Sequence, residues 1–132
     1  MWIPPLLIIP LIVYNLVAFG LVGAQGAGWV EPVMSIPMVS GAVWTISVGD
    51  LLILSALALL FMEVLKSTRT GAQSIIDHMA STMVFVAYLV EFLIVPAAST
   101  SLFFILLVMS LIDLVAGFSV SIRAAGRDVN FN

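Results

Sequence analysis

Four long apolar segments constrain the fold of this chain more than any other feature of its sequence. They cover residues 3–24, 41–65, 74–95 and 101–122, and each is long enough for a helix to cross a bilayer. Because the hydrocarbon layer offers no water to satisfy backbone groups, α-helices are the expected form of such segments. The sequence therefore predicts an all-α integral membrane protein, in which residues 1–132 form a single domain of four antiparallel transmembrane helices.

The composition agrees with this prediction. Of the 132 residues, 63% are hydrophobic and only 8% are charged, whereas a soluble domain carries about a quarter charged residues. The chain has no cysteine, which excludes disulfides, thiolate metal sites and cysteine nucleophiles. A multi-pass membrane protein in contact with lipid is the expected class.

The four basic residues predict the orientation. Lys66 and Arg69 lie between the second and third segments, and Arg123 and Arg127 follow the fourth. In a four-span protein both places are on the same side as the N-terminus, and basic residues favour the cytoplasmic side. We expect both termini in the cytoplasm and the protein in a bacterial inner (plasma) membrane.

The outer loop, residues 25–40, has the sequence QGAGWVEPVMSIPMVS and is not an ordinary polar loop. Pro32 and Pro37 favour extended backbone there. One interpretation is an interfacial cover over the bundle. The other is a docking surface for a lipid, a quinone or a partner subunit, because methionine side chains adapt to varied partners. The candidate partner or lipid contacts are Trp29, Met34, Met38 and Trp44.

Polar residues form stripes on the third and fourth segments. At about 100° per residue, one face of the third carries Asp77, Ser81, Val84, Tyr88 and Glu91. A face of the fourth carries Ser110, Asp113, Gly117 and Ser121. Polar residues within a membrane are expected to face protein rather than lipid.

Three carboxyl groups are the candidates for chemistry inside the membrane. Asp50 and Glu91 are expected at similar depth near the outer side, and Asp113 somewhat deeper, with no Lys or Arg at that depth. Because an ionised carboxylate buried alone is too costly, these groups are protonated, hold a cation or line water, or meet a basic residue of another subunit. The candidate ion or proton path comprises Asp50, Glu91, Asp113, Tyr88 and Asn15.

Two further acidic residues have simpler interpretations. Glu63 lies three residues before Lys66, which predicts an ion pair at the end of a helix. Asp77 and His78 stand near the start of the third segment, where a negative charge is favoured, and an interfacial pair is expected.

Two functions fit these features. With one histidine, no nucleophile motif, no phosphate loop and no basic patch, we expect no cofactor, no metal, no enzymatic activity and no nucleic-acid binding. The first hypothesis is a non-catalytic accessory, assembly or structural subunit of a membrane complex or homo-oligomer. The alternative is a small proton- or cation-coupled transporter or channel that uses Asp50, Glu91 and Asp113. Quinone- or lipid-linked roles stay open.

Overall fold

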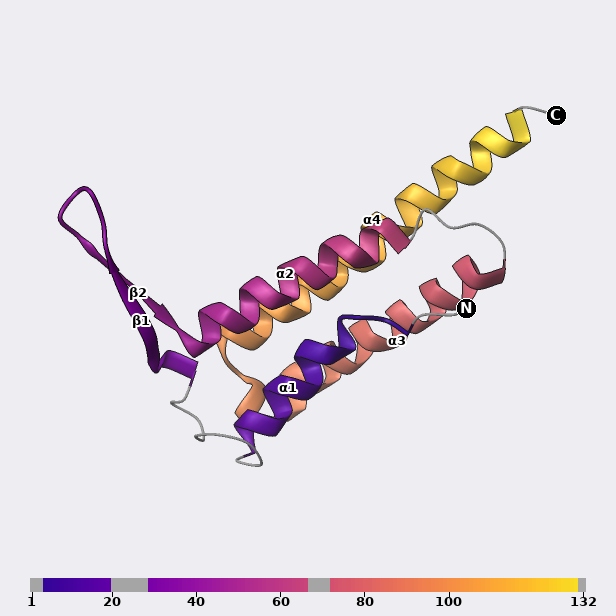
Figure 1. Cartoon of the computed structure of the whole chain (residues 1–132). Coiled ribbons are helices and arrows are strands. Elements are labelled where there is room, and N and C mark those ends of the chain that lie inside the picture. Colours follow the sequence, from indigo (N-terminus) through magenta and orange to yellow (C-terminus); the bar gives the residue numbers. More distant parts are fainter. Residues whose placement is uncertain (1–3, 20–28, 67–71, 131–132) are drawn as a thin grey trace.

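Most of the chain forms a bundle of helices from which a β-hairpin projects (Figure 1). The structure, a computed structural model, describes residues 4–19, 29–66 and 72–130. In chain order the elements are α1 (Ile8–Ala18), β1 (Pro32–Pro37), β2 (Val43–Ser47), α2 (Val48–Lys66), α3 (Ala72–Ile94), the short 3-10 helix η2 (Pro96–Ala98) and α4 (Ser101–Asn130).

Three of these helices are long and apolar enough to cross a membrane. The candidate spans are Val48–Lys66, Ile75–Ile94 and Ser101–Ser119, and they correspond to the second, third and fourth apolar segments. Large apolar side chains are exposed on their outer faces, among them Met83 and Leu93 at 70% each, as lipid-facing residues are. The predictions of a membrane protein and of transmembrane helices are confirmed.

The first apolar segment is a shorter helix than predicted. Within residues 4–19, α1 has 11 residues, or about 16 Å of helix against the roughly 30 Å of the hydrocarbon layer. Residues 3 and 20–24 of the predicted span lie outside the described residues. The segment Pro4–Ala18 nevertheless runs alongside much of the bundle: the Leu6 N–H donates to the Glu63 carboxylate, and the Tyr14 hydroxyl donates to the Ala97 carbonyl at 2.8 Å.

Residues 41–47, predicted as the start of the second span, form a turn and a strand instead. β1 and β2 pair antiparallel, with Ile36 opposite Trp44, and Gly41 turns between them at φ +93°, a conformation that favours glycine. The β-branched and aromatic residues of VWTIS favour a strand. Residues 32–37 of the predicted interfacial loop therefore form a strand of this hairpin, and their extended backbone agrees with the two prolines, whereas residues 25–28 lie outside the described residues.

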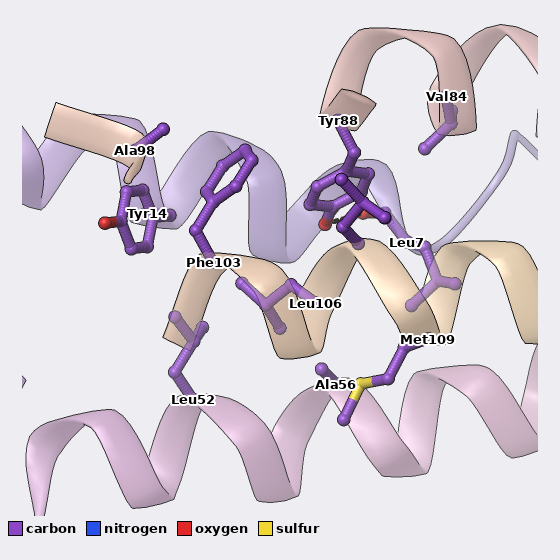
Figure 2. Packing of buried hydrophobic residues seen from close by; sticks show 11 residues of the cluster. Leu7, Tyr14, Leu52, Ala56, Val84, Tyr88, Ala98, Phe103, Leu106 and Met109 are labelled. Carbon is purple, nitrogen blue, oxygen red and sulfur yellow. Dashed lines mark hydrogen bonds between the residues drawn. The ribbon is translucent and has the colours of Figure 1, made fainter. Parts of the chain in front are cut away.

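The core lies between all four helices, and α2 contributes Leu52 and Ala56 to it. Tyr14, Tyr88 and Phe103 are fully buried, and the Phe103 ring centroid is 4.9 Å from Tyr14 and 5.4 Å from Tyr88. Figure 2 shows Leu106 and Met109 of α4 continuing this layer toward α2. Aromatic packing thus joins the short α1 to the two long helices beside it.

Trp29 attaches the base of the hairpin to the bundle. Its ring stacks on Tyr14, with centroids 5.1 Å apart and planes within 11°. Its carbonyl oxygen packs against Gly49: a Cβ at position 49 would lie only 3.0 Å from this oxygen. A glycine at this point of α2 lets the two backbones approach.

Candidate functional site

The two polar stripes face the interior of the bundle, as predicted. On α3 the side chains of Asp77, Ser81, Val84 and Tyr88 are buried, and on α4 those of Ser110 and Asp113 are buried. The side chain of Ser121 lies outside those described. A stripe at helical spacing therefore identified the protein-facing side of both helices.

Asp50 lies apart from this interior, at the start of α2. Its side chain is exposed. Its Oδ2 accepts a 3.0 Å hydrogen bond from the Ser47 N–H, and its own N–H donates to the Ser47 hydroxyl at 3.2 Å. This reciprocal pair is a capping box, which satisfies backbone donors at a helix start. The Asp50 carboxylate acts locally in the cap.

Glu91 contacts α1. Its Oε1 accepts a 3.1 Å hydrogen bond from the Asn15 amide, which also donates to the Leu11 carbonyl at 2.9 Å. Its Oε2 is buried without a hydrogen-bond partner in the described part of the chain. One turn earlier on α3, the Tyr88 hydroxyl donates to the Leu7 carbonyl at 2.8 Å. Asn15, Tyr88 and Glu91 therefore lie together at the α1–α3 contact.

A second group of polar residues lies toward the opposite end of the bundle from Glu91, and we call it the acid–lysine cluster. It surrounds a cavity of about 10 Å³ between α2, α3 and α4, next to Gly117. A space of this size holds about one water molecule. The cluster comprises Glu63, Lys66, Asp77, His78, Ser81 and Asp113.

Glu63 and Lys66 form the predicted ion pair, and the structure shows it to be buried. Lys66 Nζ is 3.0 Å from Glu63 Oε1, and the two side chains are only 8% and 3% exposed. Lys66 also donates to the Pro4 carbonyl at 3.1 Å, while Glu63 accepts from the Leu6 N–H. The pair therefore also binds the segment that leads into α1.

The remaining acids of the cluster are Asp77 and Asp113. Both are buried, at 8% and 6% exposed, and Asp77 Oδ1 has no hydrogen-bond partner within the described residues. The Ser81 hydroxyl lies beside the Asp113 carboxyl. The structure thus turns Asp77 into the bundle, and His78, which lines the same cavity, stacks its ring on Phe118 with centroids 4.5 Å apart.

The three carboxyls of the predicted path are therefore separated into three environments. Asp50 caps a helix, Glu91 contacts Asn15, and Asp113 lies in the acid–lysine cluster. The expectation that Asp113 has no basic residue at its depth is wrong, because Lys66 lines the same cavity.

The sequence analysis did not predict that Asp77 and Glu63 lie near Asp113, although the rise per residue of a helix allows the depth of each residue to be estimated. At about 1.5 Å per residue, Asp113 lies about 18 Å from the start of α4, whereas Glu91 lies about 5 Å from the facing end of α3. By the same rise, Glu63 lies about 22 Å from the start of α2 and Asp77 about 26 Å from the facing end of α3. Both residues are closer in depth to Asp113 than to Glu91.

The candidate contact residues divide into one attached to the bundle and three on the hairpin. Trp29 is half-buried against Tyr14. Met34, Met38 and Trp44 are exposed at 53%, 38% and 49%. The hairpin therefore presents apolar side chains beyond the helices.

The fold and these sites define a multi-pass membrane protein with three candidate spans and polar residues buried between its helices. No group of three or more His, Cys, Asp or Glu side chains suited to a metal ion occurs in residues 4–19, 29–66 and 72–130. Comparisons with protein-family models, curated proteins and solved structures found no match.

Proposed function

We propose that this chain is a non-catalytic subunit of a membrane complex, hetero- or homo-oligomeric, and that it binds its partner through the β-hairpin. The observation that carries this proposal is the hairpin's apolar face, formed by Met34, Ile36, Trp44 and Ile46. Cross-strand partners share a face, and these four residues are paired as Met34 with Ile46 and Ile36 with Trp44. Among them only Ile46 is buried.

An uncovered hairpin of this kind needs a partner. Two strands without further packing are marginally stable at best in water. Both outer edges of this two-stranded sheet carry backbone groups available for pairing. A protein surface that packs on the apolar face or pairs with an edge would stabilise it.

Charge favours a protein partner over the lipid surface. Residues 29–47 contain no Lys or Arg and one acid, Glu31, which is exposed. Anionic lipid headgroups attract basic segments and give an acidic one no electrostatic attraction. The apolar face therefore fits the apolar surface of another subunit better than the headgroup layer.

The proposed topology has four spans, with both termini in the cytoplasm of a bacterial cell and the hairpin on the outer side. The path of Pro4–Ala18 alongside the bundle supports a first span, since this segment contacts both Glu63 and Ala97. Lys66 at the end of α2 and Arg69 between α2 and α3 support the orientation, as do Arg123 and Arg127, which follow the candidate span Ser101–Ser119 within α4.

Site-specific photocrosslinking tests the subunit role. A photoreactive phenylalanine derivative is placed at Trp44 on the apolar face, or at Val43 on the opposite face as a control, since both side chains are exposed. In the native membrane we expect a stoichiometric protein adduct from position 44 and much less from position 43. Mass spectrometry then shows whether the adduct is a second copy or another chain. Adducts with lipid alone, or equal adducts from both positions, would contradict the proposal.

A proton- or cation-coupled transporter or channel is the second candidate, and the acid–lysine cluster favours it, because buried acids in membrane helices commonly mark ion paths. In liposomes, Asp113→Asn and Glu91→Gln should abolish flux while leaving the fold intact. Full flux in both variants, or none in the wild type under any gradient, would exclude this function.

A further inference from the structure

The outer edge of β2 exposes a short row of backbone groups. In an antiparallel ladder, hydrogen-bonded and non-hydrogen-bonded pairs alternate. The Met38 N–H donates to the Ala42 carbonyl at 2.7 Å, so this pair is hydrogen-bonded. The pairs that contain Val43 and Thr45 lie one and three positions further along the ladder and are therefore non-hydrogen-bonded. The N–H and C=O groups of these two residues point away from β1, and both residues are exposed.

The capping box of α2 marks the end of this row. By the same alternation, the Ser47 N–H also points outward, and it donates to Asp50 Oδ2 at 3.0 Å. The groups open to a further strand are therefore those of Val43 and Thr45, which we call the open edge. The hairpin projects away from the helices (Figure 1), and none of them covers this edge.

The outer edge of β1 is much less suited to pairing. Its outward positions include Pro32 and Pro37, the partners of Ser47 and Val43, and proline has no N–H to donate. The register also shifts between Pro32 and Met34. Prolines and bulges are features that protect a sheet edge from further strands. The hairpin thus has one protected edge, on β1, and one open edge, on β2.

We propose that β2 pairs antiparallel with β2 of a second copy of this chain, centred on Trp44, so that two hairpins form one four-stranded sheet. This inference rests on the proposed subunit role and names its partner. The open edge is complementary to itself: a two-fold axis at Trp44 places Val43 opposite Thr45 of the second copy, and Thr45 opposite Val43. Each of these pairs exchanges both of its backbone hydrogen bonds, so every group of the two open edges is satisfied.

Charge and side chains favour a second copy as the occupant. Residues 32–47 contain no charged side chain, so two identical strands meet without repulsion. A two-fold axis perpendicular to the sheet keeps the apolar faces of both hairpins on the same side. The two Trp44 rings then stand in the central non-hydrogen-bonded pair, where side chains are closest, and aromatic cross-strand pairs stabilise a sheet.

The prolines of β1 limit this assembly to two copies. Each chain contributes one open edge, and the four-stranded sheet ends on both sides in a protected β1. An interface that uses the same patch on both copies is closed by its two-fold axis. A hairpin with two open edges would instead continue to recruit strands. A homodimer is therefore the expected assembly.

Disulfide formation in the native membrane tests this pairing, since the chain has no native cysteine. In the proposed register the two Cα atoms at position 44 are about 4.5 Å apart, within the span of a disulfide. We expect Trp44→Cys to form mainly a disulfide-linked dimer under mild oxidation. Met34→Cys is the control: Met34 and Trp44 are similarly exposed, at 53% and 49%, but two copies of position 34 would lie at least about 14 Å apart, across three strand spacings. Equal dimer from both variants would overturn the proposal.

Two proline variants test the edge itself. In the Trp44→Cys chain, Thr45→Pro removes an outward N–H from β2, and Ser35→Pro removes its counterpart from β1. Both substitutions remove the 3.2 Å contact between the Ser35 and Thr45 hydroxyls, and both positions belong to a non-hydrogen-bonded pair, where proline is tolerated. We expect Thr45→Pro to abolish the disulfide-linked dimer and Ser35→Pro to retain it. A dimer that survives Thr45→Pro, or is lost equally in both, would overturn the proposal.

A second pair of variants keeps Trp44 in place. Val43→Cys and Thr45→Cys, coexpressed with different tags, should form a mixed disulfide, whereas each alone should form much less, because identical positions are then diagonal neighbours about 7–8 Å apart. No disulfide from this pair or from Trp44→Cys would overturn the homodimer. If photocrosslinking at position 44 then yields a different chain, the subunit role stands without the homodimer. Adducts with lipid alone would contradict both.

Discussion

The hydroxyl of Tyr88 donates a 2.8 Å hydrogen bond to the carbonyl oxygen of Leu7, and both residues are almost completely buried. Leu7 immediately precedes α1, whereas Tyr88 lies on the inward stripe of α3. This bond therefore attaches the short first helix to a long one in the middle of the core.

Tyr88→Phe removes this hydrogen bond and retains the ring. We expect the free energy of unfolding to fall by about 1 kcal/mol, the usual net contribution of one buried hydrogen bond. Urea unfolding in mixed micelles measures the change. Val86→Ala, on the exposed side of the same helix, is the control and should change stability by less than about 0.5 kcal/mol. An unchanged free energy of unfolding in Tyr88→Phe would show that this hydrogen bond contributes nothing to stability.

Lys66→Met leaves the Glu63 carboxylate buried without its cation. We expect the free energy of unfolding to fall by about 3–5 kcal/mol, because an uncompensated buried charge is more harmful than the loss of an ion pair. The double variant Glu63→Gln with Lys66→Met removes both charges and should recover much of that loss. If the double variant is as unstable as the single one, packing of the lysine chain rather than charge dominates.

Ser47→Ala and Asp50→Ala each remove one half of the capping box at the start of α2. Each should lower the free energy of unfolding by about 1 kcal/mol, as the loss of a helix cap usually does. The control is Ser55→Ala: its exposed hydroxyl donates only to the Leu51 carbonyl at 2.9 Å within the same helix, a bond of little value to stability. Unchanged stability in both cap variants would contradict the assigned role of Asp50.

Single-cysteine variants test the proposed topology against a background without native cysteine. In intact cells, a membrane-impermeant maleimide should label Ser40→Cys, near the turn of the hairpin. Arg127→Cys should react only after lysis, because three candidate spans separate the two positions. Labelling of both from the same side would mean that one of these helices does not cross the membrane, and the reverse pattern would invert the orientation.

The local sequence pattern was sufficient to predict the three long helices and the faces that they turn toward the interior of the bundle. The continuous apolar runs predicted α2, α3 and α4 because a bilayer admits few other backbone forms. The spacing of Asp77, Ser81 and Tyr88 predicted which side of α3 is buried, since helical periodicity alone assigns residues to a face. The Glu63–Lys66 ion pair could be predicted for the same reason: both partners lie within one turn.

The residue at which α2 starts could not be predicted from hydropathy alone. Residues 41–47 continue the apolar run of the second segment, yet residues 43–47 pair with β1 until the capping box starts the helix at Val48. Strand pairing depends on a partner segment, which a window of apolar residues does not show.

The sequence by itself determined a membrane protein with long apolar helices and two polar stripes, because periodicity and hydrophobicity are properties of neighbouring residues. Only the tertiary structure decided which acids meet. It separated Asp50, Glu91 and Asp113, and it placed Asp77 and Asp113 around one cavity beside the Glu63–Lys66 pair. The physical reason is that the depth and rotation of three packed helices, rather than the character of any one of them, bring charges within reach of each other.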